Sequence, residues 1–215
     1  MIDPGEMVLF GAGGHAAVVA DAAVSAGFVL AGVLADRRPD GEGTPPFGGV
    51  PWLGDPEDPD SSLADLLSRG ARVHAAVGDP AIRRRWLADR LDVAATIVHP
   101  SAVVSPSATI GPGVFIGPGA VINARALVET GAIVNSAAVV EHDAWVGAFA
   151  HVAPAAVLLG GARVGPDSLV GASSVVLPEI EVGSGSTLAA GAVASTSIPA
   201  GVVARGVPAR FEDGA

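Results

Sequence analysis

His142, with an acidic residue on either side, is the strongest candidate for chemistry in this sequence. The run is Val140-Glu141-His142-Asp143. An imidazole titrates near neutral pH and can therefore take up and return a proton, and a neighbouring carboxylate can orient the ring and raise its basicity. Glu141 or Asp143 could supply that carboxylate. A solvated surface histidine is the alternative interpretation. The structural elements around His142 distinguish between the two.

Those elements follow a repeat of six residues. From Val98 to Leu188 every sixth residue is Val, Ile or Leu, and a small residue, usually Ala, stands four positions after most of them. A period of six fits neither a strand nor a helix, and it is typical of a hexapeptide β-helix. Three hexads, 18 residues in all, would make one triangular coil. Residues 98 to about 197 would then make between five and six coils.

The coil length predicts which residues lie beside His142. Ala124 precedes it by eighteen residues and Gly160 follows by eighteen, so both should stack against it and leave open space for a ligand. Asn135, just before the His142 hexad, could form hydrogen bonds in the same trough. His151 lies nine residues further on, which is half a coil. If the two histidines share a site, they must therefore come from neighbouring subunits.

Residues 7–92 alternate between strand and helix patterns, which favours a small parallel sheet. We expect strands at 7–10, 28–34 and 73–77, and helices at 16–25, 61–69 (capped by Ser61) and from 80 to about 90. The turn Gly11-Ala12-Gly13-Gly14-His15-Ala16 stands between the first strand and the first helix, where a phosphate can bind. Asp36 ends the second strand, where an acid often meets a ribose hydroxyl. A tight turn that needs glycines is the alternative.

Composition excludes several kinds of chemistry. The 215 residues contain no Cys, and all 12 basic residues are Arg, so a thiolate nucleophile, Cys-ligated zinc and a Schiff-base lysine are impossible. The net charge of −10 disfavours nucleic acid as a partner. No apolar run approaches the roughly 18 residues of a membrane span, and the acidic start lacks the basic region of a signal peptide. We expect a cytoplasmic protein without a metal and without membrane contact.

Taken together, these residues resemble the bacterial sugar O-acyltransferases of the sialic-acid acetyltransferase type, and within them the nucleotide-amino-sugar N-acetyltransferases. The resemblance covers nearly the whole chain. Its motifs are Val8-Leu9-Phe10-Gly11-Ala12-Gly13-Gly14-His15, Ala76-Val77-Gly78-Asp79, Ile97-Val98-His99-Pro100-Ser101-Ala102, Val139-Val140-Glu141-His142-Asp143 and Arg205-Gly206-Val207-Pro208-Ala209-Arg210.

The resemblance implies two domains: a Rossmann-like α/β domain at residues 1–95 that binds the nucleotide sugar, and a left-handed parallel β-helix at 96–215 that carries the acetyltransferase. It also implies a homotrimer with acetyl-CoA, as co-substrate, in the groove between neighbouring prisms. Many members have a basic residue where this chain has Ala17, so any contact made there is missing.

The resemblance implies site residues as well. His142 matches the family's base, with Asp143 as its acidic support, and we group Glu141 with them. His151 and Gly160 match contacts of the CoA thioester and pantetheine arm, to which we add Asn135 and Ala190. We expect the sugar nucleotide to contact Gly11, Gly13, Gly14, His15, Asp36, Arg37 and Asp79.

The predicted activity is acetyl-CoA-dependent N-acetylation of a nucleotide-linked 4-amino-6-deoxy sugar. O-acetylation of sialic acid or of another sugar hydroxyl stays open. A γ-type carbonic anhydrase is a rival with the same repeats, but they offer only His142 and His151 as zinc ligands, with His99 at their edge. A non-catalytic partner of a sugar enzyme stays open too, as does a nicotinamide oxidoreductase, which the glycine turn alone suggests.

Overall fold

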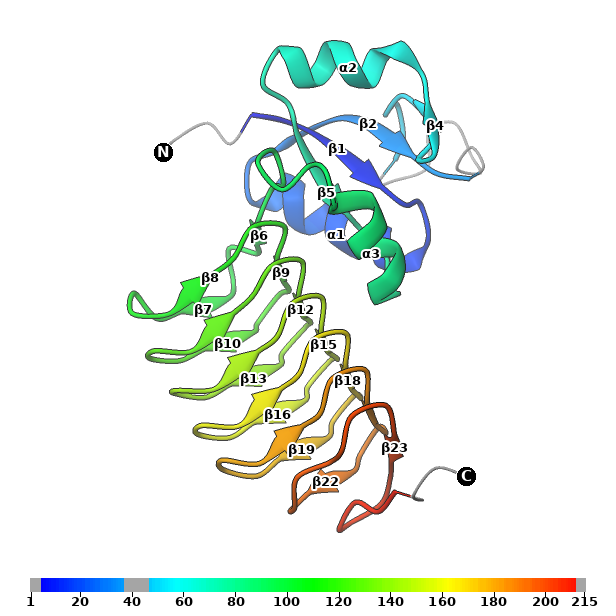
Figure 1. Cartoon of the computed structure of the whole chain (residues 1–215). Coiled ribbons are helices and arrows are strands. Elements are labelled where there is room, and N and C mark those ends of the chain that lie inside the picture. The colour runs from blue at the N-terminus through cyan, green and yellow to red at the C-terminus, as the bar shows by residue number, and fades with distance from the viewer. Residues whose placement is uncertain (1–4, 37–46, 212–215) are drawn as a thin grey trace. The chain divides into compact units, whose positions relative to one another are not determined.

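The computed structural model describes residues 5–36 and 47–211, and Arg37 of the expected substrate contacts lies outside them. The chain forms two compact units, Met1–Pro100 and Ser101–Ala215 (Figure 1). The division lies five residues beyond the boundary that we expected between residues 95 and 96.

The first unit is built on a parallel three-stranded sheet in the order β2-β1-β5, which confirms the predicted alternation of strands and helices. The central strand β1 is apolar, and its residues Met7 to Phe10 are fully buried. The elements are β1 (Glu6–Phe10), α1 (Gly14–Ser25), β2 (Val29–Leu34), β3 (Gly54–Asp55), β4 (Asp58–Pro59), α2 (Ser61–Ser68), β5 (Arg72–Ala75), α3 (Pro80–Leu87) and β6 (Ile97–Val98).

The ends of these helices differ in part from the prediction. Helix α1 begins at Gly14, two residues early, with Gly13 as N-cap. The predicted cap of α2 was wrong: Asp60, not Ser61, holds that position, and its carboxylate accepts a hydrogen bond from the Ser62 N–H. A carboxylate serves this role well because it also interacts favourably with the positive end of the helix dipole.

The second unit is a parallel β-helix, which confirms the predicted fold class (Figure 1). Its strands have two residues each and fall into three sheets, and strands in adjacent coils pair in parallel at a spacing of 18 residues. One sheet holds β7 (Val103–Val104), β10 (Val121–Ile122), β13 (Val139–Val140), β16 (Val157–Leu158), β19 (Val175–Val176) and β22 (Val193–Ala194). The second holds β8 (Thr109–Ile110), β11 (Leu127–Val128), β14 (Trp145–Val146), β17 (Arg163–Val164) and β20 (Glu181–Val182). The third includes β9 (Phe115–Ile116), β12 (Ile133–Val134), β15 (His151–Val152), β18 (Leu169–Val170), β21 (Thr187–Leu188) and β23 (Val203–Ala204).

The hexad pattern explains the interior of the prism. Every sixth residue from Ile116 to Leu188 is at most 1% exposed, and so is every sixth residue from Ala120 to Ala162. Where the small residue is Ser in later coils, the buried hydroxyl donates to a backbone carbonyl, as Ser168 does to Gly183 at 2.7 Å. Buried polar groups need such partners. The final coil is shorter, since Thr187 pairs with Val203 at a spacing of 16.

The corners of the prism use a left-handed backbone conformation in every coil. One corner stacks Arg125, Asp143, Gly161 and Glu179, with φ between 59° and 68°. Residues other than Gly rarely adopt this conformation, and Asp tolerates it better than most. Each corner therefore presents a vertical column of residues, one from each coil, in a fixed direction.

The outward ladders of two of the sheets differ in chemistry. On the sheet that contains β13, the outward residue of every strand is valine, and we call this surface the valine face: Val103, Val121, Val139, Val157, Val175 and Val193. The sheet that contains β14 instead presents mixed side chains, among them Trp145, with the Arg163 guanidinium 4.9 Å from its ring centroid.

In the described part of the chain, no helix is long and apolar enough to cross a membrane.

Candidate active site

His142 lies at the corner between the valine face and the sheet of β14, and its ring is held by Asp143. The ring Nδ1 lies 2.7 Å from Asp143 Oδ2. A carboxylate accepts, so Nδ1 carries the proton, and the neutral ring presents the lone pair of Nε2 for proton uptake. The side chain is 58% exposed. The ring is therefore oriented by a carboxylate, unlike a freely solvated histidine.

Gly160 lies directly beside the His142 ring, as the coil spacing predicted. A Cβ atom built on Gly160 would lie 2.8 Å from both His142 Cε1 and Nε2. The ring therefore rests directly over the glycine, in space that any side chain would occupy. On the opposite side, the Asp143 N–H donates to the Ala124 carbonyl at 3.1 Å, so the three predicted coils do stack at this corner.

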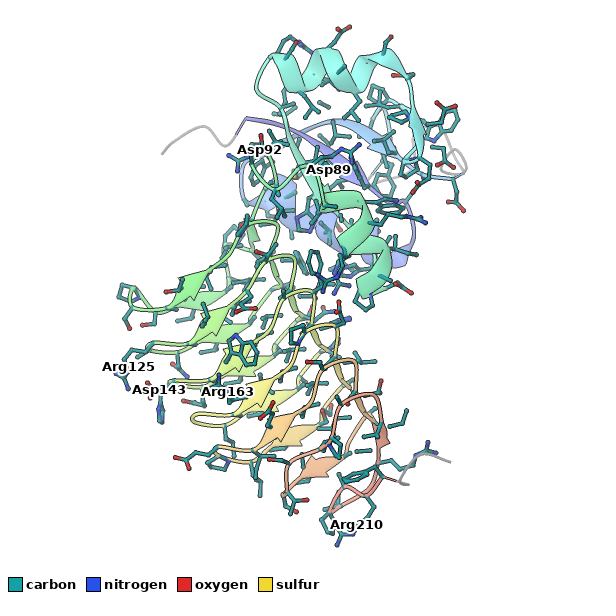
Figure 2. All side chains as sticks on the ribbon, viewed as in Figure 1. Asp89, Asp92, Arg125, Asp143, Arg163 and Arg210 are labelled. Carbon is teal, nitrogen blue, oxygen red and sulfur yellow. The ribbon has the colours of Figure 1, made fainter. Side chains whose placement is uncertain are left out.

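Arg125 completes the group and was not found by sequence reasoning. Its Nε donates to Asp143 Oδ1 at 2.7 Å and an Nη to Asp143 Oδ2 at 2.8 Å (Figure 2). This bidentate pair, followed by the His142 hydrogen bond, holds the pKa of Asp143 well below its usual range, and the pair raises the pKa of Arg125. The signal was available, because Arg125 precedes Asp143 by one coil of eighteen residues.

Glu141 has a different contact from the one its neighbours make. Its Oε2 accepts a hydrogen bond from the backbone N–H of His142 at 3.3 Å. Of the two candidate carboxylates, Asp143 therefore orients the ring, and Glu141 contacts the main chain.

Asn135 lies at the adjacent corner, between the sheet of β15 and the valine face, and its side chain contacts His151 of β15. The Asn135 Oδ1 accepts from the Ser136 N–H at 2.8 Å, so the amide nitrogen is directed to His151 Nε2, 3.1 Å away. In its neutral form His151 therefore carries its proton on Nδ1. Ala190 lies further along this corner, against Gly171. Within one chain Asn135 is thus separated from His142, and the two do not share one trough as the sequence suggested.

The glycine turn of the first unit divides into two parts. Gly11 has φ 113°, and a Cβ there would lie 2.9 Å from Val77 Cγ1, so this position needs glycine for the backbone. Gly13 and Gly14, by contrast, have nothing within 4 Å of an added Cβ. Because they start α1, they leave open space at a helix N-terminus, where an anion is favoured. Asp36 follows β2 and is exposed.

Two further residues of this unit have structural contacts. Asp79 is the N-cap of α3 and accepts from the Ile82 N–H at 3.0 Å. Arg83 is buried, and its Nη1 donates to the carbonyls of Val77 and Gly78 at 3.0 and 2.6 Å. Sequence reasoning missed Arg83 within a run of three arginines, although it shares a helix face with Leu87, four residues on.

Burial lowers the pKa of the two histidines near this turn. Desolvation lowers the pKa of His15 to about 4, and the Arg83 charge contributes. Desolvation likewise lowers the pKa of His74 to about 4, even though its ring bonds to the Ala95 carbonyl at 2.9 Å. His74 is a buried residue of β5, as its position in a strand predicted, and both rings are neutral at neutral pH.

The two hollows of the last coils do not contain the candidate residues. Two hollows of about 410 Å³ lie in the last coils, one lined by Val203, Arg205, Arg210 and Phe211, the other around Ser184 and Ser197, and neither includes a candidate residue. Among the described residues, no three His, Cys, Asp or Glu side chains gather as a metal site would require.

A β-helix of hexads with an exposed histidine held by a carboxylate is joined in this chain to an α/β unit with an open glycine turn, the combination that the resemblance to hexapeptide-repeat acyltransferases implies. Residues 6–89 match a family model described as the PglD N-terminal domain. A search among curated protein sequences finds no match.

Solved structures match over nearly the whole chain. PerB from Caulobacter crescentus, in complex with CoA and GDP-perosamine, is 35% identical with a TM-score of 0.86, and 97% of each chain is covered. The acetyltransferase domain of PglB from Neisseria gonorrhoeae, in complex with acetyl coenzyme A, is 34% identical with a TM-score of 0.86 over 96% of this chain and 98% of that one. A histidine-to-alanine mutant of GDP-perosamine N-acetyl transferase from Caulobacter crescentus, with CoA and GDP-perosamine, is 35% identical with a TM-score of 0.85, again over 97% of each.

The chain therefore belongs to the nucleotide-sugar N-acetyltransferases of the hexapeptide-repeat family, and it is an acetyltransferase. This confirms the family resemblance of the sequence.

Proposed function

We propose that this protein transfers the acetyl group of acetyl-CoA to the amino group of a nucleotide-linked 4-amino-6-deoxy sugar, with His142 as general base. The observation that carries the proposal is the His142 ring, fixed through Nδ1 by Asp143 with Nε2 left for the proton. The similarity to enzymes solved with CoA and GDP-perosamine supports the two co-substrates.

The transfer is direct in this proposal. The sugar nitrogen attacks the thioester carbon while its proton passes to His142 Nε2, and the C–S bond breaks as the tetrahedral intermediate collapses. The imidazolium then returns the proton to the CoA thiolate. The Gly161 N–H already donates to the His142 carbonyl at 3.0 Å, so we assign stabilisation of the oxyanion to the Gly160 N–H. Direct transfer needs no covalent enzyme intermediate, which suits a chain without Cys.

The site is completed between subunits of a homotrimer in our proposal. The valine face lies between the His142 corner and the Asn135 corner. If three valine faces pack around a three-fold axis, the His142 corner of one subunit meets the Asn135 corner of the next. His142 and Gly160 would then share a groove with the partner's Asn135, His151 and Ala190, where we place acetyl-CoA. Large exposed apolar surfaces are typical of such interfaces.

The glycine turn is our proposed site for the nucleotide. The open space beside Gly13 and Gly14 at the start of α1 suits a phosphate, and the exposed Asp36 suits a ribose hydroxyl. His15, held neutral by burial, would add no positive charge at this site.

The first experiment measures CoA release with a thiol reagent, because the absence of Cys keeps the background low. Acetyl-CoA is offered with UDP-, GDP- and dTDP-linked amino sugars and with sialic acid. We expect turnover with an amino sugar and a loss of about 10²–10⁴-fold in kcat for His142→Ala, the usual contribution of a general base. Turnover with sialic acid alone would assign O-acetylation. Undiminished activity of the variant would exclude His142 as the base.

Assembly is tested separately by light scattering. Val157→Asp places a charge in the middle of the valine face and should reduce the mass to that of a monomer with loss of activity. Leu127→Asp, on the neighbouring outward ladder, is the matched control and should stay trimeric. A wild-type monomer with full activity would refute the shared site.

A further inference from the structure

The Asp143 carboxylate is shared between two partners. Its Oδ2 accepts from His142 Nδ1 at 2.7 Å and from Arg125 at 2.8 Å, while its Oδ1 accepts from the Arg125 Nε at 2.7 Å. Both oxygens are thus occupied by one guanidinium. The fork of a guanidinium matches a carboxylate in plane and spacing, so it fixes the orientation of the carboxylate as well as its charge.

The geometry of the coils brings the Arg125 and Asp143 side chains together. Arg125 and Asp143 occupy the same corner position in successive coils, both in the left-handed conformation, with φ 59° and 61°. Adjacent strands of a sheet are about 4.8 Å apart, so the two side chains leave the corner in parallel and meet over one coil. Figure 2 shows them side by side at this edge of the β-helix.

We propose that Arg125 is a positioning residue for the reaction, which fixes Asp143 and through it the orientation and proton affinity of the His142 ring. This inference rests on the proposed role of His142 as base. Arg125 opposes part of the negative charge that Asp143 presents to the ring. The Asp143 hydrogen bond therefore aligns the ring. The guanidinium limits how strongly Asp143 stabilises the imidazolium, so the ring can still return its proton.

The other charged groups near this corner have different positions. Glu141 contacts the His142 backbone N–H. Glu179 lies in the same corner column as Asp143, two coils on, with Gly161 between them. Both are acidic, whereas Arg125 brings a positive charge into contact with the Asp143 carboxylate.

The test compares Arg125→Gln and Arg125→Lys with the wild type. Arg163→Gln is the matched control, since Arg163 stacks on Trp145, whereas the ion pairs of Asp143 are with Arg125 and His142. We expect Arg125→Gln to lower kcat about tenfold, with an unchanged KM for acetyl-CoA, and to shift the acidic limb of the kcat/KM profile to higher pH. Lysine should restore the profile in part, because it keeps the charge and loses the fork. Arg163→Gln should match the wild type in both respects.

A double-mutant cycle locates the effect. If Arg125 acts through Asp143, Arg125→Gln should cost little further activity in an Asp143→Asn background. Equal losses in both backgrounds would overturn the inference and indicate direct contact of Arg125 with a substrate.

A readout without turnover keeps this test independent of the proposed function. Nitrogen NMR shifts of the histidine rings report which nitrogen carries the proton. We expect a single Nδ1–H form for neutral His142 in the wild type and a mixture of tautomers in Arg125→Gln. An unchanged tautomer together with an unchanged pH profile would refute the role of Arg125, even if His142→Ala is inactive. An active His142→Ala would instead refute the proposed base.

Discussion

Replacing Gly160 by alanine tests the site at the point where packing and chemistry meet. The added Cβ would lie 2.8 Å from two atoms of the His142 ring, whereas ordinary contacts begin at 3.4 Å and extend to 4 Å. The ring must therefore move by roughly 0.6–1.2 Å, and a misplacement of about 1 Å can cost about 10²-fold in rate. We expect kcat/KM of Gly160→Ala to fall by about two orders of magnitude.

Stability should not fall with activity. Gly160 is outside the left-handed region, so alanine fits its backbone, and such a replacement commonly stabilises a protein by about 0.4–1 kcal/mol through the unfolded state. The group it displaces is the exposed end of a side chain, which can move at little cost. Thermal unfolding should therefore occur at the wild-type temperature or slightly above it.

The assay combines CoA release with thermal unfolding for Gly160→Ala, His142→Ala and the double variant. If the loss acts through the ring, Gly160→Ala should cost almost nothing in the His142→Ala background. Activity within twofold of wild type for Gly160→Ala would show that the ring does not rest on this glycine in the working enzyme. A further large loss in the double variant would place the effect on acetyl-CoA instead.

Two predictions concern stability. His74 is buried with its pKa lowered to about 4 from 6.5, so the unfolded chain binds more protons between these values and stability falls as the pH drops from about 6.5 to 4; that single group contributes about 3 kcal/mol over the window. Urea unfolding of His74→Gln should show a smaller decrease over the same range, and an identical slope would contradict the assignment. In the β-helix, an alanine at Gly131 combines φ 63° with a collision against the Phe149 ring. We expect a loss of about 2–4 kcal/mol in the free energy of unfolding. Gly191→Ala, with φ 68° and open space, should cost only the backbone part of that loss, and equal losses for the two variants would remove Phe149 from the explanation.

The repeat made the β-helix predictable in detail, because one period fixed both the interior residues and their neighbours in adjacent coils. The stacking of Gly160 on His142 followed from the coil length of eighteen residues alone. Arg125 obeys the same rule, but its role appears only when the eighteen-residue spacing is counted from the carboxylate of Asp143 and not from the histidine.

Other features needed coordinates. Each hexad turns the chain past one corner of a triangle, so Asn135 and His142 lie at different corners although they are seven residues apart. In the first unit, Asp60 and Ser61 are both good caps, and only the path of the chain decides between them. The burial of Arg83 depends on the side of α3 that faces the sheet, which a short helix rich in arginine does not reveal clearly.

The eighteen-residue coil also limits how the gene for this protein can change in length. Arg125, the pair His142 and Asp143, and Gly160 stand in three successive coils, so gain or loss of one coil between residues 125 and 160 would separate partners that must touch. In a repeat fold each coil depends mainly on its neighbours, so a coil gained or lost beyond residue 161 leaves this group intact. Whole repeats can therefore change in number beyond residue 161 without separating the partners of His142, but such a change would displace Ala190 from the proposed acetyl-CoA groove.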